Sequence, residues 1–379
     1  MPKSQTSKPL DNLKNSLDDR ILYPWQYLEY LGEDDRTFIE KSEGIYLFDK
    51  TGRKLIDGPG GMWNVNVGHG VKEIADAVYA QIRSMPYASP FTESTEIAYN
   101  YASRLVKYAP GDLKRVFFTS GGSAAVDSAL RFVMFYNNVR GLRDKKQIIS
   151  RHDAYHGSTY LGASCSGKER DKNNFDFAND IVHHLSSPNP FRKPDDMSDE
   201  DFCDLKVKEL EDKIIEIGPE KVAAFIAEPI LASGGVIVPP KGYQKKTLEV
   251  CRKYDVIYIS DEIVTGFGRL GHIFASENYF DIQPDIILLA KGITSGYVPC
   301  GAVVISERLM SQLDHKEKVI FSNGFTDSGH PVSMAAATAT LDYIEKTNLL
   351  DHVKEVGPYL QSRLQELTDL PIVGEVRGE

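Results

Sequence analysis

Short apolar runs alternate with segments of helical period through the middle of the chain. Four of these runs are continuous, as expected of strands that are buried on both faces of a sheet: residues 222–227, 256–259, 286–289 and 302–305. Residues 241–254, between the first two runs, have apolar positions at helical spacing. Strands that alternate with helices favour an α/β fold with a mainly parallel sheet.

Other segments extend this pattern in both directions. Residues 45–49 and 54–56 alternate apolar and polar positions around the turn Lys50-Thr51-Gly52, which predicts a β-hairpin. Further strands are predicted at 116–118 and 147–149, and further helices at 124–136, 205–217, 331–346 and 350–367. The charge-rich segment 193–204 is interpreted as a solvated loop, and residues 372–376 as the start of one more strand.

Composition and charge narrow the class of protein. The chain has 379 residues, of which 41% are hydrophobic and 26% are charged, a normal balance for a globular protein. A net charge of -10 makes nucleic acid and anionic membrane lipid unfavourable partners. The four cysteines form no CxxC pair, so neither a disulfide framework nor a metal site is expected. No secretory signal and no long apolar run is visible, which predicts a cytoplasmic protein.

Two residues next to predicted strand ends carry candidate chemistry. Lys291 comes soon after strand 286–289, and a buried amine with a lowered pKa forms Schiff bases readily. The alternative is a lysine whose stem reaches the surface. Asp261 follows strand 256–259, at the sheet edge where ligands of open α/β folds bind. A carboxylate there can keep a pyridinium nitrogen protonated, and the alternative is a helix N-cap.

A glycine turn and an aromatic residue complete the candidate set. Gly122 and Ser123 lie between a predicted strand and a predicted helix, where free backbone N–H groups can hold a phosphate. Tyr155 stands beside a glycine turn and can stack on a flat ring, although a core tyrosine is the simpler reading. His156 is a candidate base or a structural histidine. Phosphate cradle, aromatic ring, carboxylate and amine together suit one cofactor, pyridoxal 5'-phosphate (PLP).

Ordered motifs support the same cofactor. Ser-Asp-Glu-Ile-Val-Thr-Gly-Phe-Gly-Arg (260–269) followed by Ala-Lys-Gly-Ile (290–293) resembles the signature of class III PLP-dependent aminotransferases. Four other stretches look like further motifs of that family: 122–127, 154–158, 227–230 and 324–332. The resemblance implies fold type I, the aspartate aminotransferase type. It consists of a large α/β domain with a mostly parallel sheet and a small α/β domain from both chain ends.

The resemblance also implies domain limits and residue roles. Residues 71–330 form the large PLP-binding domain, and residues 1–70 and 331–379 contribute to the small one. Lys291 carries the cofactor as a Schiff base and then moves the substrate proton, and Asp261 pairs with the pyridine nitrogen. The other implied cofactor contacts are Gly122 and Ser123 at the phosphate, Tyr155 and Val264 on the two ring faces, and Glu228 in a supporting place. Thr326 reaches the phosphate of the neighbouring subunit, so a homodimer is expected.

The substrate pocket resembles that of one subgroup. Trp63 and Phe91 look like the pocket aromatics of ω-amine:pyruvate transaminases, and Tyr155 borders the same pocket. Ser233 stands where ornithine- and GABA-type members carry a gating glutamate, and Val264 where they carry glutamine. An amine or ω-amino acid donor and a pyruvate-like 2-oxo acid acceptor are therefore expected.

Two alternatives stay open from the sequence. The first is another PLP reaction on the same scaffold, such as a decarboxylase or an aminomutase. The second is a truncated chain that binds PLP without turnover. By comparison with the family, the chain is expected to stop before the small domain is complete. The usual substrate-carboxylate arginine would lie in that missing part, so no residue is assigned to it.

Overall fold

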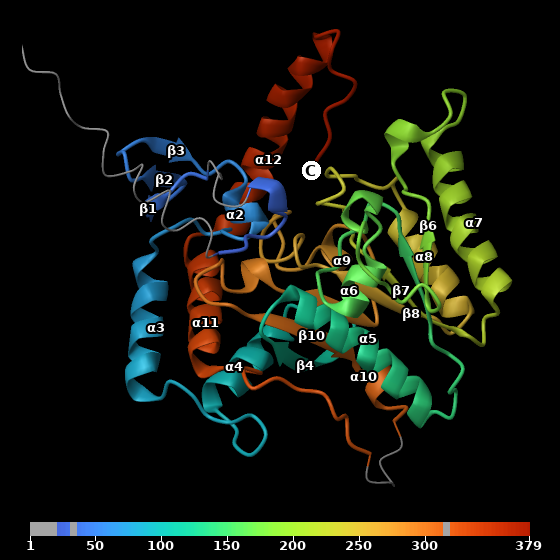
Figure 1. Cartoon of the computed structure of the whole chain (residues 1–379), viewed down its shortest axis with the longest axis horizontal. Helices are drawn as coiled ribbons and strands as arrows, with labels where there is room; N and C mark the ends of the chain where they lie inside the picture. Colours follow the sequence, from blue (N-terminus) through green and yellow to red (C-terminus); the bar gives the residue numbers. More distant parts are fainter. Residues whose placement is uncertain (1–20, 31–35, 314–318) are drawn as a thin grey trace, which may run out of the picture. The chain divides into compact units, whose positions relative to one another are not determined.

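The computed structural model describes residues 21–30, 36–313 and 319–379, and the chain forms two compact units, Met1–Gly58 and Pro59–Glu379 (Figure 1). The sequence also predicts that the two ends of the chain together form one small domain, and this stays a prediction. No helix among the described residues is long and apolar enough to cross a membrane.

The first unit contains a small antiparallel sheet. Its strands are β1 (Ile39–Glu43), β2 (Tyr46–Asp49) and β3 (Lys54–Ile56), in that order, and a short 3-10 helix (Leu28–Tyr30) precedes them. The predicted hairpin is confirmed as β2 and β3. Asp49 closes its turn, because Oδ1 accepts hydrogen bonds from the backbone N–H groups of Thr51 and Arg53, both at 2.9 Å. β1 was not predicted, since its Ile-Glu-Lys-Ser-Glu sequence is largely exposed.

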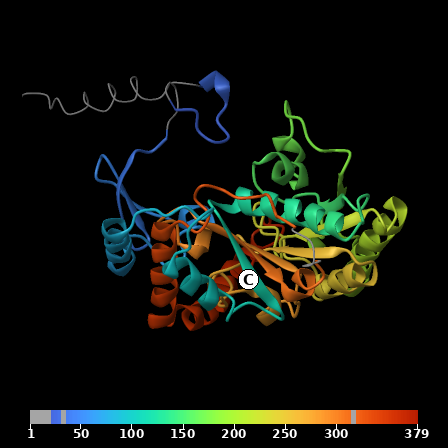
Figure 2. The ribbon, with the colours of Figure 1, turned by 90° about the horizontal axis from the view of Figure 1, so that it is seen from below.

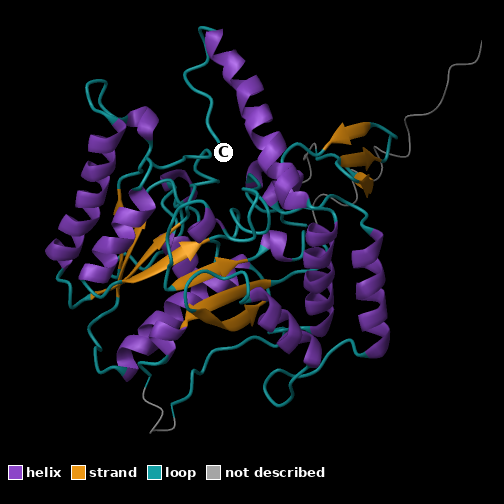
Figure 3. Ribbon diagram, turned by 180° about the vertical axis from the view of Figure 1, so that it is seen from behind, coloured by secondary structure: helices purple, strands orange, loops and turns teal. Residues whose placement is uncertain are grey.

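The second unit is built on a seven-stranded sheet with the order β4-β10-β9-β8-β7-β5-β6 (Figure 3). Its strands are β4 (Leu113–Thr119), β5 (Gln147–Arg151), β6 (Val182–Leu185), β7 (Val222–Ala227), β8 (Ile257–Asp261), β9 (Ile286–Leu289) and β10 (Gly301–Ser306). β6, β5, β7, β8 and β9 are parallel, whereas β10 is antiparallel to both of its neighbours. The predicted mainly parallel α/β sheet is confirmed. β6 was not predicted, because it is a four-residue edge strand with two histidines.

Helices cover both faces of this sheet. The helices of the second unit are α2 (Gly60–Trp63), α3 (Lys72–Ser84), α4 (Glu96–Leu105), α5 (Gly122–Val139), α6 (Tyr160–Cys165), α7 (Asp199–Ile217), α8 (Tyr243–Lys253), α9 (Ala275–Asn278), α10 (Glu307–Met310), α11 (Pro331–Lys346) and α12 (Leu349–Gln365). α5, turquoise in Figure 2, lies along one face. α11 packs on the other face and also against α3 and α4.

The strand side chains explain the continuous apolar runs. In β9, Ile286 and Leu288 join the cluster under α5, whereas Ile287 and Leu289 join the cluster under α11. All four side chains are fully buried. Successive residues of a strand point to opposite faces, so a strand covered on both sides is apolar at every position.

Two sequence interpretations are wrong. The charged segment 193–204 is not a loop throughout, because α7 begins at Asp199. Ser198 caps it by accepting a hydrogen bond from the Asp201 N–H at 3.0 Å, and three acidic residues occupy the first turn, where the helix dipole favours them. Residues 372–376 form no strand in the described chain. A strand needs a hydrogen-bonded neighbour, and this segment instead packs Gly374 against the Phe191 ring.

Because the central strands are buried on both faces, truncating one of their side chains should lower the free energy of unfolding strongly. Leu288→Ala removes a fully buried side chain and should lower the free energy of unfolding by about 2–5 kcal/mol. Leu205→Ala, in the exposed part of α7, is the matched control and should change it by less than about 0.5 kcal/mol. Urea unfolding followed by circular dichroism measures both. Similar losses from the two variants would contradict the two-sided core.

Candidate active site

The carboxyl ends of β7, β8 and β9 bring three ionisable residues together. These strands are parallel and adjacent, with Ala227 opposite Ser260 and Asp261 opposite Leu288. Glu228 therefore follows β7, Asp261 ends β8 and Lys291 follows β9 at one edge of the sheet. Open α/β sheets bind ligands at this edge.

Lys291 occupies an unusual backbone position in a partly buried place. It begins a 3-10 helix (Lys291–Ile293) with φ of +45°, in the left-handed region that non-glycine residues seldom adopt outside turns and functional sites. Burial lowers the pKa of its amine, and the carboxylates of Asp261 and Glu228 partly oppose that effect. An amine with a lowered pKa is uncharged more often and is a better nucleophile.

Asp261 is buried and has two partners. Its Oδ2 accepts a hydrogen bond from His156 Nδ1 at 2.7 Å, and its Oδ1 accepts one from the Ile263 N–H at 3.2 Å. The backbone of His156 is also fixed, because its N–H donates to Ser166 Oγ at 2.8 Å. The sequence left His156 open as a base or a structural residue, and the structure makes it the partner that orients Asp261.

Glu228 joins two loops beneath the site. Its Oε1 accepts the Tyr155 N–H at 2.9 Å, and its Oε2 accepts the Ala232 N–H at 3.1 Å. Burial raises the pKa of this carboxyl, and neighbouring His156 partly opposes the increase. The guanidinium of the fully buried Arg151 donates to the Glu228 backbone carbonyl at 2.6 Å. Glu228 thus fixes the loop that carries Tyr155.

The N-terminus of α5 packs closely against two loops of this sheet edge. A Cβ on Gly122 would lie 3.0 Å from Ile263 Cδ1, so the helix start packs closely against the loop after Asp261. Ser123 Oγ accepts the Ser158 N–H at 3.1 Å. Gly157 has φ of +103°, and a Cβ there would lie 2.5 Å from Ser123 Oγ. An uncapped N-terminus of a long helix attracts an anion through its free N–H groups and its dipole.

Tyr155 and Val264 lie on two different loops of this edge. Tyr155 is partly exposed, and its hydroxyl is 3.2 Å from Ser158 Oγ. Val264 is partly exposed in the turn three residues after Asp261. Both side chains are therefore only partly buried, and their contact with a cofactor stays a prediction.

Trp63 belongs to a segment that packs against the loop that begins at Lys291. Asn66 Nδ2 donates to the Phe267 carbonyl at 3.0 Å, and a Cβ on Gly292 would lie 2.4 Å from that same nitrogen. The Val67 N–H donates to Ser295 Oγ at 3.0 Å. Asn66 was missed in the sequence. Its only signal there is its place in the glycine-rich stretch around Trp63.

Phe91 and Thr326 lie elsewhere in the same chain. A Cβ on Gly324 would lie 3.3 Å from the Phe91 ring, and the Tyr87 hydroxyl donates to the Thr326 carbonyl at 3.1 Å. Phe91 is 68% exposed, and Thr326 is exposed as well. In the described chain no hydrogen bond or ion pair joins either residue to Lys291 or Asp261.

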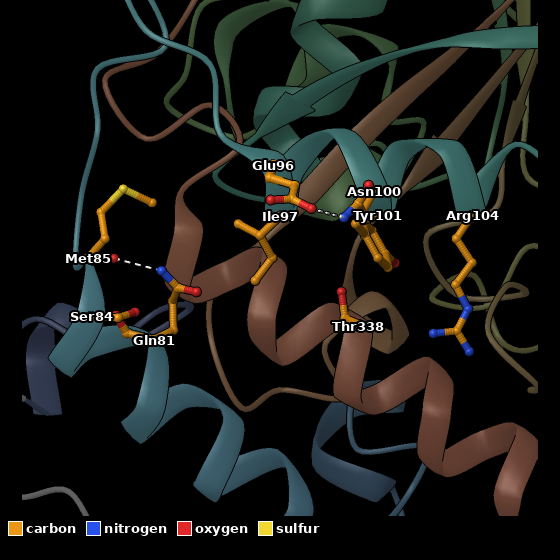
Figure 4. A pocket seen from close by; sticks show the side chains of 9 residues that line it. All are labelled: Gln81, Ser84, Met85, Glu96, Ile97, Asn100, Tyr101, Arg104 and Thr338. Atoms are coloured by element: carbon orange, nitrogen blue, oxygen red, sulfur yellow. Dashed lines mark hydrogen bonds between the residues drawn. The ribbon is translucent and has the colours of Figure 1, made fainter.

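A separate cavity of about 510 Å³ lies between α3, α4 and α11 (Figure 4). Tyr101 lines it, and its buried hydroxyl has no hydrogen-bond partner among the described residues. None of the predicted site residues lines this cavity. The candidate site is therefore the sheet edge around Lys291.

The residues at this edge fit PLP. The start of α5 suits a phosphate, because it has no side-chain cap and offers free N–H groups and the helix dipole to an anion. Asp261 supplies a buried carboxylate already oriented by His156, and Lys291 supplies an amine with a lowered pKa. This donor set is what a phosphate, a pyridine nitrogen and an aldehyde require.

Comparisons with known proteins agree with this geometry. The family model described as aminotransferase class-III matches residues 31–379. The putrescine–pyruvate aminotransferase of Pseudomonas aeruginosa is 40% identical over 362 residues, which are 95% of this chain and 79% of that protein. A mitochondrial gamma-aminobutyrate transaminase 1 of Oryza sativa subsp. indica is 39% identical over 346 residues, covering 90% of this chain and 67% of that protein.

Solved structures show the same likeness. An (S)-enantioselective omega-transaminase from Thermomicrobium roseum has a TM-score of 0.93 at 36% identity, covering 98% of this chain and 82% of that chain. The omega-transaminase from Pseudomonas jessenii in complex with PMP has the same TM-score, identity and coverage. The chain belongs to the class III aminotransferases, a fold type I family that uses PLP.

Proposed function

We propose that this aminotransferase moves an amino group from an amine or ω-amino acid to pyruvate or a similar 2-oxo acid in two half-reactions. The observation that carries the proposal is the meeting of Lys291, Asp261 and Glu228 at one sheet edge, with the Lys291 pKa lowered by burial. The named activity of the Pseudomonas aeruginosa relative supports the choice of an amine donor and pyruvate. The aromatic character of Trp63 and Phe91 supports a pocket for an uncharged substituent.

When bound, PLP supplies a conjugated ring that withdraws electrons from the substrate carbon. Lys291 holds the cofactor and afterwards accepts and returns a proton at that carbon. Its lowered pKa suits this work, because the uncharged form of the amine is the one that accepts a proton. Asp261, held by His156 Nδ1, places a negative carboxylate against the pyridine nitrogen.

The remaining residues bind and orient the cofactor. Gly122 and Ser123 hold the phosphate at the start of α5, while Tyr155 and Val264 contact the two ring faces. Glu228 positions Tyr155 through its backbone N–H. Thr326 reaches the phosphate of a second copy of the chain in a homodimer, and its exposure on one chain supports this arrangement. We also propose a cytoplasmic location, which four free, buried cysteines support.

The first prediction tests the reaction itself. The PLP-loaded chain mixed with an amine, without pyruvate, should form pyridoxamine phosphate in one turnover. Lys291→Ala should abolish this conversion, and borohydride should no longer fix a phosphopyridoxyl group to the chain. Absorbance and peptide mass mapping measure the two effects. The control is Lys172→Ala, which removes a lysine that forms an ion pair with Glu169. Release of carbon dioxide without amino transfer would instead support a decarboxylase.

The second prediction concerns pH. Capture of PLP needs the uncharged form of Lys291, so the capture rate should rise with pH. Because burial lowers the pKa of this amine, the midpoint should lie below the ordinary value of 10.5. Asp261→Asn removes an influence that raises the pKa and should move the midpoint lower still. Stopped-flow absorbance measures the rates, and a midpoint at or above 10.5 would contradict the burial of the amine.

The third prediction separates binding from chemistry. Asp261→Asn keeps the size of the side chain but loses its charge, so PLP should still bind. The amine half-reaction should slow about 100-fold or more, by analogy with the loss of one strong electrostatic contact. Asp342→Asn, exposed and paired with Arg104, is the matched control. Single-turnover kinetics measure the step, and an unchanged rate in Asp261→Asn would remove Asp261 from the proposed role.

A further inference from the structure

The segment that carries Trp63 has an unusual backbone. Four consecutive residues have positive φ: Gly60, Gly61, Met62 and Trp63, at +57°, +58°, +61° and +60°. The left-handed region is unfavourable for the two of them that carry side chains. The Trp63 N–H donates to the Pro59 carbonyl at 2.9 Å, which closes the turn. Backbone strain of this kind persists only where the surrounding structure holds it.

The loop after Lys291 is strained in the same way and lies against this segment. Lys291, Ser295 and Gly296 have φ of +45°, +52° and +80°. The Val67 N–H donates to Ser295 Oγ at 3.0 Å, and a Cβ on Gly296 would lie 2.9 Å from Asn64 Nδ2. The residues that follow Trp63 in the chain therefore pack directly on the loop that begins at Lys291.

Asn66 lies at the centre of this contact. Its Nδ2 donates to the Phe267 carbonyl at 3.0 Å, and its Oδ1 accepts a hydrogen bond from the Arg269 guanidinium at 2.5 Å. A Cβ on Gly292 would lie 2.4 Å from Asn66 Nδ2 and 2.7 Å from Phe267 Cβ. The residue next to Lys291 thus has room for a hydrogen only, and Asn66 limits how far this loop can move.

Arg269 holds Asn66 without an acidic partner. Its side chain is partly buried, and burial lowers the pKa of its guanidinium. Among the described residues no carboxylate forms an ion pair with it, and its Nε has no hydrogen-bond partner. A buried charge without a carboxylate destabilises a fold, so stability alone does not account for Arg269. A Cβ on Gly60 would lie 3.9 Å from Arg269 Nη2, so the guanidinium also reaches the turn that carries Trp63.

We propose that Asn66, held by Arg269, is a positioning residue that keeps the backbone of Lys291 and the turn of Trp63 in one fixed arrangement. The inference rests on the part of the proposed function in which Lys291 carries PLP. Without the Asn66 side chain, Gly292 gains room and Lys291 can leave the left-handed region. The amine must then be ordered again before it condenses with the aldehyde of PLP and releases water.

Two forms of the cofactor separate this role from general stability. PLP bonds to Lys291, whereas pyridoxamine phosphate has an amine in place of the aldehyde and cannot form that bond. Asn66→Ala should weaken PLP binding about 10- to 100-fold, the cost of ordering a strained residue, and leave pyridoxamine phosphate binding nearly unchanged. The full chain, freed of cofactor, is titrated with each compound and followed by absorbance and fluorescence.

Asn137→Ala is the matched control. Asn137 Nδ2 donates to the Lys145 carbonyl at 3.1 Å, and its Oδ1 accepts a hydrogen bond from Arg140 at 3.5 Å, so the variant loses the same two kinds of bond. It should lower the thermal unfolding midpoint without changing the ratio of the two affinities. Arg269→Met should change that ratio in the same direction as Asn66→Ala, and Arg269→Lys, which keeps a donor, should recover part of it.

Trp63 provides a second readout that needs no cofactor. The chain has two tryptophans, so Trp25→Phe leaves Trp63 as the only one. In that background, Asn66→Ala should increase the quenching of Trp63 fluorescence by acrylamide, because the turn is released. Asn137→Ala in the same background should leave the quenching unchanged.

The outcomes distinguish this inference from the proposed function. A ratio of PLP to pyridoxamine phosphate affinity that matches the parent chain in Asn66→Ala would overturn the inference, as would an equal change in Asn137→Ala. Should Asn66→Ala lose its fold, Arg269→Met and Arg269→Lys make the same comparison. Neither titration needs an amine donor. If the ratio changes as expected while the parent chain forms no pyridoxamine phosphate with any amine, the proposed function fails and the positioning role of Asn66 is retained.

Discussion

The site depends on hydrogen bonds that stabilise buried ionisable side chains at one edge of a sheet. Burying an unpaired charge is expensive, so each buried carboxylate needs hydrogen bonds that offset the loss of hydration. Asp261 has the His156 ring and a backbone N–H, and Glu228 has two backbone N–H groups. Glu262, next in the chain, accepts the N–H groups of Ala275 and Ser276 at 2.6 and 2.9 Å.

These bonds also determine how the loops run. Because Glu228 accepts one N–H from the Tyr155 loop and another from the loop of Ala232, the two loops are drawn to the same point of the sheet edge. Close approach then requires residues without side chains. Gly157 against Ser123 and Gly301 against the Gly121 carbonyl each leave less than 3 Å for a Cβ, so larger residues would push the loops apart.

Three lysines near this edge have different neighbours. Lys291 lies where two carboxylates act on an amine whose pKa burial lowers, which suits covalent chemistry. Lys168 contacts the Tyr155 ring and the Ser233 hydroxyl. Lys172, three residues after Glu169, forms an ordinary ion pair with it. Residue type alone does not distinguish these three amines; their neighbours do.

Much of the fold could be predicted from the chain alone. Residues 222–227 and 286–289 coincide with β7 and β9, because strands covered on both faces are apolar at every position and stand out from their surroundings. Residues 331–346 coincide with α11 for a related reason, a proline start and a long apolar helix. The edge strands β1 and β6 were missed, since a strand with exposed or polar side chains has no such pattern.

At the candidate site too, only residues that stand in a recognisable sequence pattern could be predicted. Lys291 and Asp261 could be chosen because each stands next to a buried strand, and the family motifs around them strengthened the choice. The sequence by itself thus determined the strands, the cofactor inventory and the order of its parts. Only the tertiary structure decided that His156 partners Asp261, that Asn66 packs against Gly292 and that Lys168 contacts Tyr155. Those contacts join residues whose separation in the chain carries no local pattern, so they exist only once the sheet has brought its strand ends together.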